Sequence, residues 1–170
     1  MAEARALTQP SIAAFNPGAS FTMFKYDSIE EAFPPVDPGL EPMGSLVLVQ
    51  VRQPKRKTRG GIILTAEDRA TEFYNTQVAK VIAIGACAFR NRQDMTLWPE
   101  GAWCKVGDFV RIPKYQGDRF TVPYETVDKD IVGGITRTVD TVDETCFILF
   151  KDLAMLGRYT GDPLTVKCFL

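Results

Sequence analysis

Short strand-forming runs, each bounded by glycine or proline, constrain the fold of this chain more than any other feature of its sequence. The clearest runs span residues 46–51, 77–84, 109–112 and 146–150, and a less regular one spans 115–122. Their β-branched and aromatic residues favour an extended backbone, and the glycine and proline residues beside them end it. Because almost no segment favours helix, the sequence predicts an all-β fold, a small barrel or sandwich.

Three long connections separate these runs, at residues 52–76, 85–105 and 123–145. After the last run, Asp152 is expected to cap a brief helical turn over residues 153–156. Long loops without structure of their own are uncommon in a compact domain unless they are functional. We therefore expect the function of this chain to lie in its loops.

Proline is concentrated near the N-terminus, where six of the eleven prolines fall within the first 42 residues. This density excludes a long helix or a central strand there. The segment also carries five aromatic residues, which are Phe15, Phe21, Phe24, Tyr26 and Phe33. Since solvated linkers are poor in aromatics, two interpretations remain: the rings fold back on their own domain, or the arm docks on another subunit or protein. We expect an extended arm at 1–42, a barrel domain at 43–156 and a C-terminal extension at 157–170.

The chain contains no histidine, so it has no Ser-His or Cys-His nucleophile pair and no imidazole metal ligand. Its cysteines form no CxxC pair and are interpreted as small apolar residues of a protein in a reducing compartment; they are Cys87, Cys104, Cys146 and Cys168. The sequence shows no leader peptide and no apolar run approaching roughly 20 residues. It therefore predicts a cytoplasmic protein that is not an enzyme, with no catalytic or metal site, no cofactor and no membrane partner.

The first long connection begins with a basic cluster, in which residues 52–59 include five cations. A solvated, self-repelling loop is favoured over a nucleic-acid patch, because no aromatic residues are interleaved for base stacking. The whole chain also has a net charge of −1, which creates no global field for a polyanion. Nucleic acid is therefore not an expected partner.

An apolar tripeptide, Ile62-Ile63-Leu64, follows this cluster directly after Gly60-Gly61. As the start of a buried strand it would be ordinary. As an exposed segment it would present its side chains to the groove of a partner, with backbone hydrogen bonds alongside. Gly60, Gly61, Ile62, Ile63 and Leu64 are therefore the candidate partner-binding residues.

Several blocks of the sequence occur in the order typical of one known family. They are Pro42-Met43 with Val47-Leu48-Val49, then Gly60-Gly61-Ile62-Ile63-Leu64, Val78 to Gly85, Lys105-Val106-Gly107-Asp108-Phe109-Val110, and Phe147 to Leu156. This ordered set resembles the GroES-type co-chaperonins (chaperonin-10-like), the ring-forming lids of chaperonins. In that resemblance the second block corresponds to the mobile loop that docks on the chaperonin.

The resemblance implies a GroES-like β-barrel that assembles into a homo-oligomeric ring, a heptamer in the family. The ring would cap the chamber of an ATP-bound chaperonin through residues 60–64 while a client protein folds. No phosphate-binding glycine motif occurs in this chain, so the nucleotide would belong to the chaperonin.

Some segments have no counterpart in a minimal co-chaperonin: the arm, the 123–145 insertion and the tail at 160–170. The family also usually has Asp-Arg before its first valine, where this chain has Ser45-Leu46. These differences resemble a divergent member of the family, such as one encoded by a bacteriophage. The alternative hypothesis is therefore a GroES-like fold reused as a structural component of a viral particle, a capsid or decoration protein of the virion.

Overall fold

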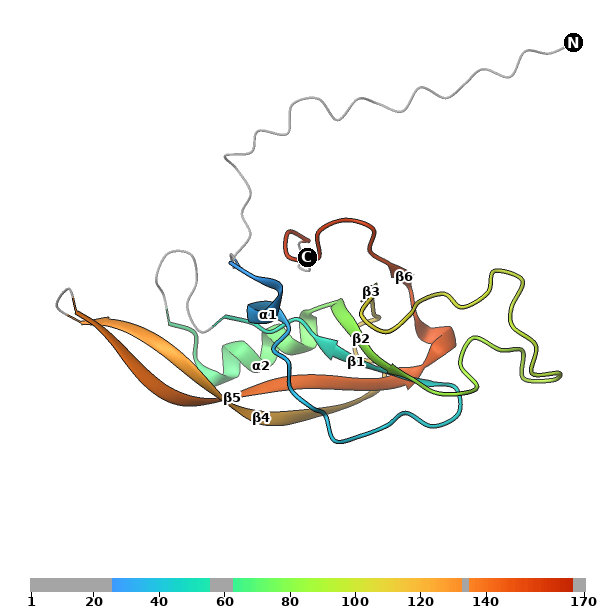
Figure 1. Ribbon diagram of the computed structural model, residues 1–170, viewed down its shortest axis with the longest axis horizontal. Coiled ribbons are helices and arrows are strands. Elements are labelled where there is room, and N and C mark those ends of the chain that lie inside the picture. The colour runs from blue at the N-terminus through green and yellow to red at the C-terminus, as the bar shows by residue number, and fades with distance from the viewer. Residues whose placement is uncertain (1–25, 56–62, 133–134, 167–170) are drawn as a thin grey trace, which may run out of the picture.

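The computed structural model describes residues 26–55, 63–132 and 135–166 (Figure 1). The order of elements is α1 (Ile29–Ala32), β1 (Leu46–Val51), α2 (Ala66–Asn75), β2 (Val78–Ile84), β3 (Phe109–Arg111), β4 (Asp118–Val132), β5 (Ile135–Lys151), the 3-10 helix η2 (Asp152–Ala154) and β6 (Gly157–Arg158). Strands dominate this order, which confirms the predicted all-β fold.

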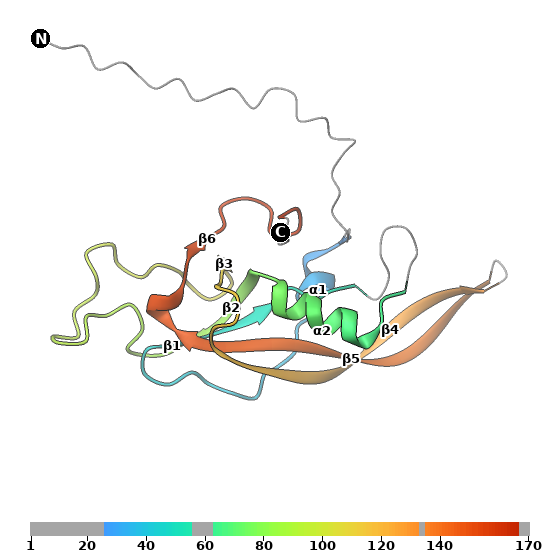
Figure 2. The same cartoon turned by 180° about the vertical axis from the view of Figure 1, so that it is seen from behind.

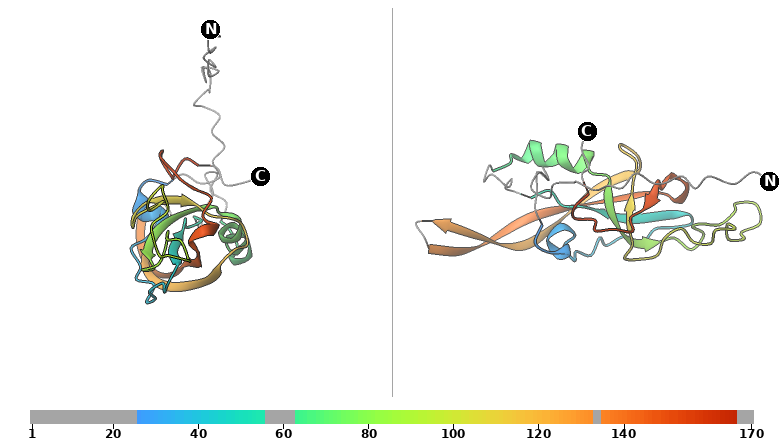
Figure 3. Two further views of the ribbon diagram at one scale, coloured as in Figure 1. Left: turned by 90° about the vertical axis from the view of Figure 1, so that its right-hand side faces the viewer. Right: turned by 90° about the horizontal axis from the view of Figure 1, so that it is seen from above.

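The six strands form one antiparallel sheet in the order β4-β5-β1-β2-β3-β6. The end-on view in Figure 3 shows the sheet curled around its own interior. That interior holds the larger hydrophobic core, whose buried members include Val47, Val49, Val81, Val110 and Ile148. The predicted strands at 46–51, 77–84 and 109–112 match β1, β2 and β3 to within one residue at each end.

The interpretation of residues 123–145 as an unstructured connection is wrong. These residues form most of a hairpin in which β4 and β5 pair without interruption from Asp118↔Leu149 to Val132↔Ile135. The predicted short strands at 115–122 and 146–150 are only the base of this hairpin. Figures 1 and 2 show the paired strands extending far beyond the rest of the sheet. Valine and threonine recur through this segment and favour such an extended backbone.

The connection at 52–76 is also more ordered than expected, because its second half is helix α2. Thr65 and Asp68 form a capping box: the Asp68 N–H donates to Thr65 Oγ1 at 3.2 Å, and the Thr65 N–H donates to Asp68 Oδ2 at 3.2 Å. This exchange satisfies two backbone donors that a helix start leaves without partners. The connection at 85–105 contains none of the named helices or strands, as predicted.

The predicted helical turn after the last strand is present as η2, but Asp152 lies inside the turn rather than capping it. Lys151 occupies the N-cap position and makes no side-chain cap hydrogen bond. The buried Asp152 carboxylate instead accepts from the Phe89 N–H at 2.6 Å and pairs with Arg92 at 2.6 Å. Asp152 therefore anchors the 85–105 connection to the end of β5.

A second layer covers the outer face of the sheet. Ala32 and Phe33 from the arm are buried there together with Val78, and Leu164 and Val166 from the tail pack against them. At least this part of the arm therefore folds back on its own domain, as one of the two interpretations expected. The arm aromatics Phe15, Phe21 and Phe24 lie outside the described residues.

Candidate functional site

The predicted partner-binding residues lie between β1 and α2, and the structure describes two of the five. Gly60, Gly61 and Ile62 are outside the described residues. Ile63 is 69% exposed, and Leu64 is half-buried. Such exposure fits a recognition segment better than the start of a buried strand, and the role of the five residues stays a prediction.

The segment that leads into this loop is tied to the arm. The Tyr26 hydroxyl donates to the Gln53 carbonyl at 2.6 Å, and Lys55 pairs with Glu31 at 2.7 Å. Arg52 and Lys55 both lie 5.5 Å from the centre of the Tyr26 ring. Two of the five cations of the basic cluster therefore have local partners, so the expected solvated loop is wrong for Arg52 and Lys55.

The same segment is tied to the tail through Arg52. Its guanidinium is buried and donates to the carbonyl of Pro163 and to that of Val166, each at 2.9 Å. Because a guanidinium carries several donors in a fixed fork, one side chain can hold two points of the tail. The arm and the tail thus meet at the base of the predicted loop.

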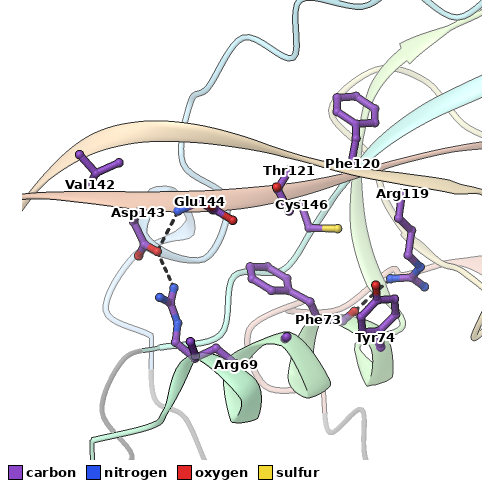
Figure 4. A pocket seen from close by; sticks show the side chains of 12 residues that line it. Arg69, Phe73, Tyr74, Arg119, Phe120, Thr121, Val142, Asp143, Glu144 and Cys146 are labelled. Carbon is purple, nitrogen blue, oxygen red and sulfur yellow. Dashed lines mark hydrogen bonds and ion pairs between the residues drawn. The ribbon is translucent and has the colours of Figure 1, made fainter.

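Helix α2 follows the loop and lies against the base of the hairpin (Figure 4). Arg69 pairs with Asp143 at 2.6 Å, and both side chains are largely buried. Arg119 donates to the Phe73 carbonyl at 3.1 Å and lies 5.4 Å from the centre of the Tyr74 ring. The two arginines therefore attach helix α2 to the hairpin at two separate points.

Between α2 and the hairpin lies an open groove with a volume of about 580 Å³ (Figure 4). Its lining residues are Ala66, Arg69, Ala70, Phe73, Tyr74, Arg119, Phe120, Thr121, Val142, Asp143, Glu144 and Cys146. Arg69 Nε and Arg119 Nη2 are buried atoms without a hydrogen-bond partner among the described residues. The groove therefore combines apolar contact area with two arginine side chains that are held by the surrounding protein.

The cysteine in this groove behaves as a small apolar residue. Burial raises the pKa of the Cys146 thiol, so it stays protonated near neutral pH. Burial likewise raises the pKa of Cys104 to about 11. These two environments agree with the interpretation of the cysteines as apolar residues; Cys168 is outside the described residues.

Sequence reasoning missed the groove, although part of its signal is present in the chain. The Thr65-x-x-Asp68 spacing is typical of a helix start and predicts α2.

Within the described ranges there is no group of three or more cysteine and acidic residues that could hold a metal ion. No helix in those ranges is long and apolar enough to cross a membrane.

Comparison with known proteins gives two matches. The family model described as chaperonin 10 Kd subunit matches residues 39–133. The co-chaperonin GroES of Tetragenococcus halophilus is 33% identical over 89 residues, which cover 52% of this chain and 84% of that protein. The family match includes residues 60–64, α2 and all of β4, whereas β5 lies beyond it.

Proposed function

Because this chain belongs to the chaperonin 10 kDa family, the family of the GroES co-chaperonins, we propose that it forms a ring that caps a chaperonin. Residues 60–64 of each subunit dock on the chaperonin, and a client protein folds in the closed chamber. The family is not one of enzymes, and the proposal assigns no catalytic step to this chain. The ring is a heptamer, acts in the cytoplasm and depends on ATP held by the chaperonin.

The observation that carries this proposal is the exposure of Ile63, a large aliphatic side chain with 69% of its surface open to solvent. It lies within the family match and in the block that resembles the docking loop of co-chaperonins. An exposed isoleucine in this block supports the proposal, because it offers apolar surface that a partner could bury.

Rough energies explain why a ring is needed. Burying Ile62, Ile63 and Leu64 contributes about 4–9 kcal/mol in total. Ordering six loop residues costs about 6–12 kcal/mol. One loop therefore binds weakly, whereas linked copies on a ring bind together at high effective concentration and still release.

The test is the variant Ile63→Asp, examined by thermal melting and by an ATP-dependent pull-down with a purified chaperonin ring. We expect the melt and the ring to be unchanged, because the side chain is exposed in the free protein. Binding is expected to fail, because docking would bury a carboxylate without a partner in every loop of the ring.

A matched control is Thr65→Ser, which keeps the capping hydroxyl of α2 and leaves Ile63 in place. A collapsed melt for Ile63→Asp, together with no binding by the wild-type protein, would contradict the co-chaperonin proposal. That outcome would instead favour a structural component of a viral particle.

A further inference from the structure

We propose that the arm positions the loop that carries residues 60–64: Tyr26 and Glu31 hold residues 53–55, and this arm contact makes the loop bind the chaperonin more tightly. The inference rests on the proposed function and adds two positioning residues to it. The family match begins at residue 39, so Tyr26 and Glu31 lie outside it. The arm contact therefore belongs to a part of the chain that the match does not cover.

The arm holds both backbone polar groups of Gln53. The Gln53 N–H donates to the Ala32 carbonyl at 2.8 Å, and the Gln53 carbonyl accepts from the Tyr26 hydroxyl at 2.6 Å. Strand β1 ends at Val51, two residues earlier. These hydrogen bonds to the arm, rather than strand pairing, therefore restrain the backbone at Gln53.

Glu31 holds Lys55, the last described residue before the loop. Glu31 Oε1 lies 2.7 Å from Lys55 Nζ, and Glu31 Oε2 accepts from the Asp27 N–H at 2.7 Å. The Glu31 N–H in turn donates to Ser28 Oγ at 3.1 Å, at the start of α1. Because α1 already fixes the Glu31 carboxylate, forming the ion pair costs less side-chain entropy than it would for two free side chains.

Helix α1 is itself anchored to the barrel. Phe33 follows the helix, is buried, and lies with its ring centre 5.2 Å from that of Phe109 in β3. Ala32 is buried with Phe33 and Val78 in the same cluster. A continuous set of contacts therefore leads from β3 through α1 to Lys55.

The other end of the loop is also held, because Thr65 and Asp68 cap α2. Without the arm contact, residues 53–55 would also have to be ordered when the loop docks, which costs conformational free energy. An exposed ion pair changes the affinity of one loop by only about 1.5-fold to fivefold. Linked loops multiply this factor, so the ring as a whole should lose affinity by about tenfold or more.

The experiment reverses the charges of the ion pair in the full chain. The variants are Glu31→Lys, Lys55→Glu and the double variant that carries both changes. The matched control is Glu30→Lys, because Glu30 is exposed in the same helix and has no ion pair among the described residues. Affinity for a purified chaperonin ring in the presence of ATP is measured for each protein beside a thermal melt.

We expect each single reversal to weaken binding by about tenfold or more, with a melting temperature within about 4 °C of the wild type. The double variant restores the ion pair with its charges exchanged, so it is expected to bind within about threefold of the wild type. Glu30→Lys is expected to stay within the same range. Recovery in the double variant separates a positioning role from a loss that each change causes alone.

Equal affinity of Glu31→Lys and wild type overturns the positioning role. A double variant as weak as Lys55→Glu also overturns it, because Lys55 would then act on the chaperonin directly. In both cases a binding defect of Ile63→Asp would still support the co-chaperonin proposal, so the two proposals fail separately. Absence of binding by the wild-type protein overturns both.

A second measurement needs no chaperonin. Tyr26→Phe removes the hydroxyl that donates to the Gln53 carbonyl and keeps the aromatic ring. Hydrogen exchange at residues 53–55 is expected to become about threefold faster or more, while β1 remains protected and Glu30→Lys exchanges like the wild type. Unchanged exchange in Tyr26→Phe would show that the arm does not restrain this segment, which overturns the positioning role.

Discussion

The two halves of the β4–β5 hairpin are built from the same paired strands but lie in different surroundings. In the barrel half, residues 118–122 and 145–151, β5 also pairs with β1, and Phe147 and Ile148 are buried. In the distal ribbon, residues 123–132 and 135–144, the only strand pairing in the described part of the chain is between β4 and β5. Strand pairing alone therefore does not make a segment part of the hydrophobic core. The barrel half contributes buried side chains to the fold, whereas most of the described side chains of the distal ribbon are exposed.

The largest effect is expected from Phe147→Ala in the barrel half. Phe147 is fully buried and stacks on Phe120 with ring centres 5.6 Å apart. Truncating a buried phenylalanine removes apolar contacts and leaves a cavity, so the free energy of unfolding should fall by about 3–5 kcal/mol. Denaturant unfolding measures this change. A loss below about 1 kcal/mol would mean that the barrel half does not carry the fold.

A smaller effect is expected from Arg69→Met, at the junction of the two halves. The variant keeps much of the side-chain volume but leaves the largely buried Asp143 carboxylate without its 2.6 Å ion pair. The expected loss in the free energy of unfolding is about 1–2 kcal/mol. Hydrogen exchange should also become faster in the distal ribbon near Asp143, while β1 remains protected. Equal acceleration in β1 would show that the two halves unfold as one unit.

The smallest effect is expected from Val139→Ala in the distal ribbon. Val139 is 44% exposed, and it lies opposite Asp128 on the paired strand. Because little surface is buried there, the free energy of unfolding should change by less than about 0.5 kcal/mol. Denaturant unfolding beside Phe147→Ala gives the direct comparison. A loss of more than about 2 kcal/mol would show that the ribbon is part of the folding core.

The inner strands could be predicted from the sequence because burial shapes their composition. Leu46–Val51 is almost wholly apolar and is buried nearly throughout as β1. In the distal ribbon, valine and threonine alternate irregularly with charged residues, so no buried face stands out. The ribbon is extended because its two strands pair with each other. Strand pairing restricts the type of residue less than burial does, so it produces a weaker sequence pattern.

The groove could not be predicted because folding assembles it from distant segments. Arg69 and Asp143 meet across 74 positions of the chain, and Arg119 reaches Phe73 across 46. No local pattern relates such residues. By contrast, the candidate loop at 60–64 is contiguous, so its apolar tripeptide beside two glycines stands out in the sequence itself.

The hydrogen bonds from Arg52 to the tail determine when the base of the loop can form during synthesis of the chain. Arg52 leaves the ribosome more than one hundred residues before its acceptors, the carbonyls of Pro163 and Val166. Strand β1 likewise can pair with β5 only after β5 has been synthesised, since Leu46 pairs with Lys151. Contacts between such distant positions form slowly and late. The base of the loop therefore forms only after nearly the whole described chain has been made. Nascent chains interrupted earlier would lack a completed base beneath the loop at 60–64.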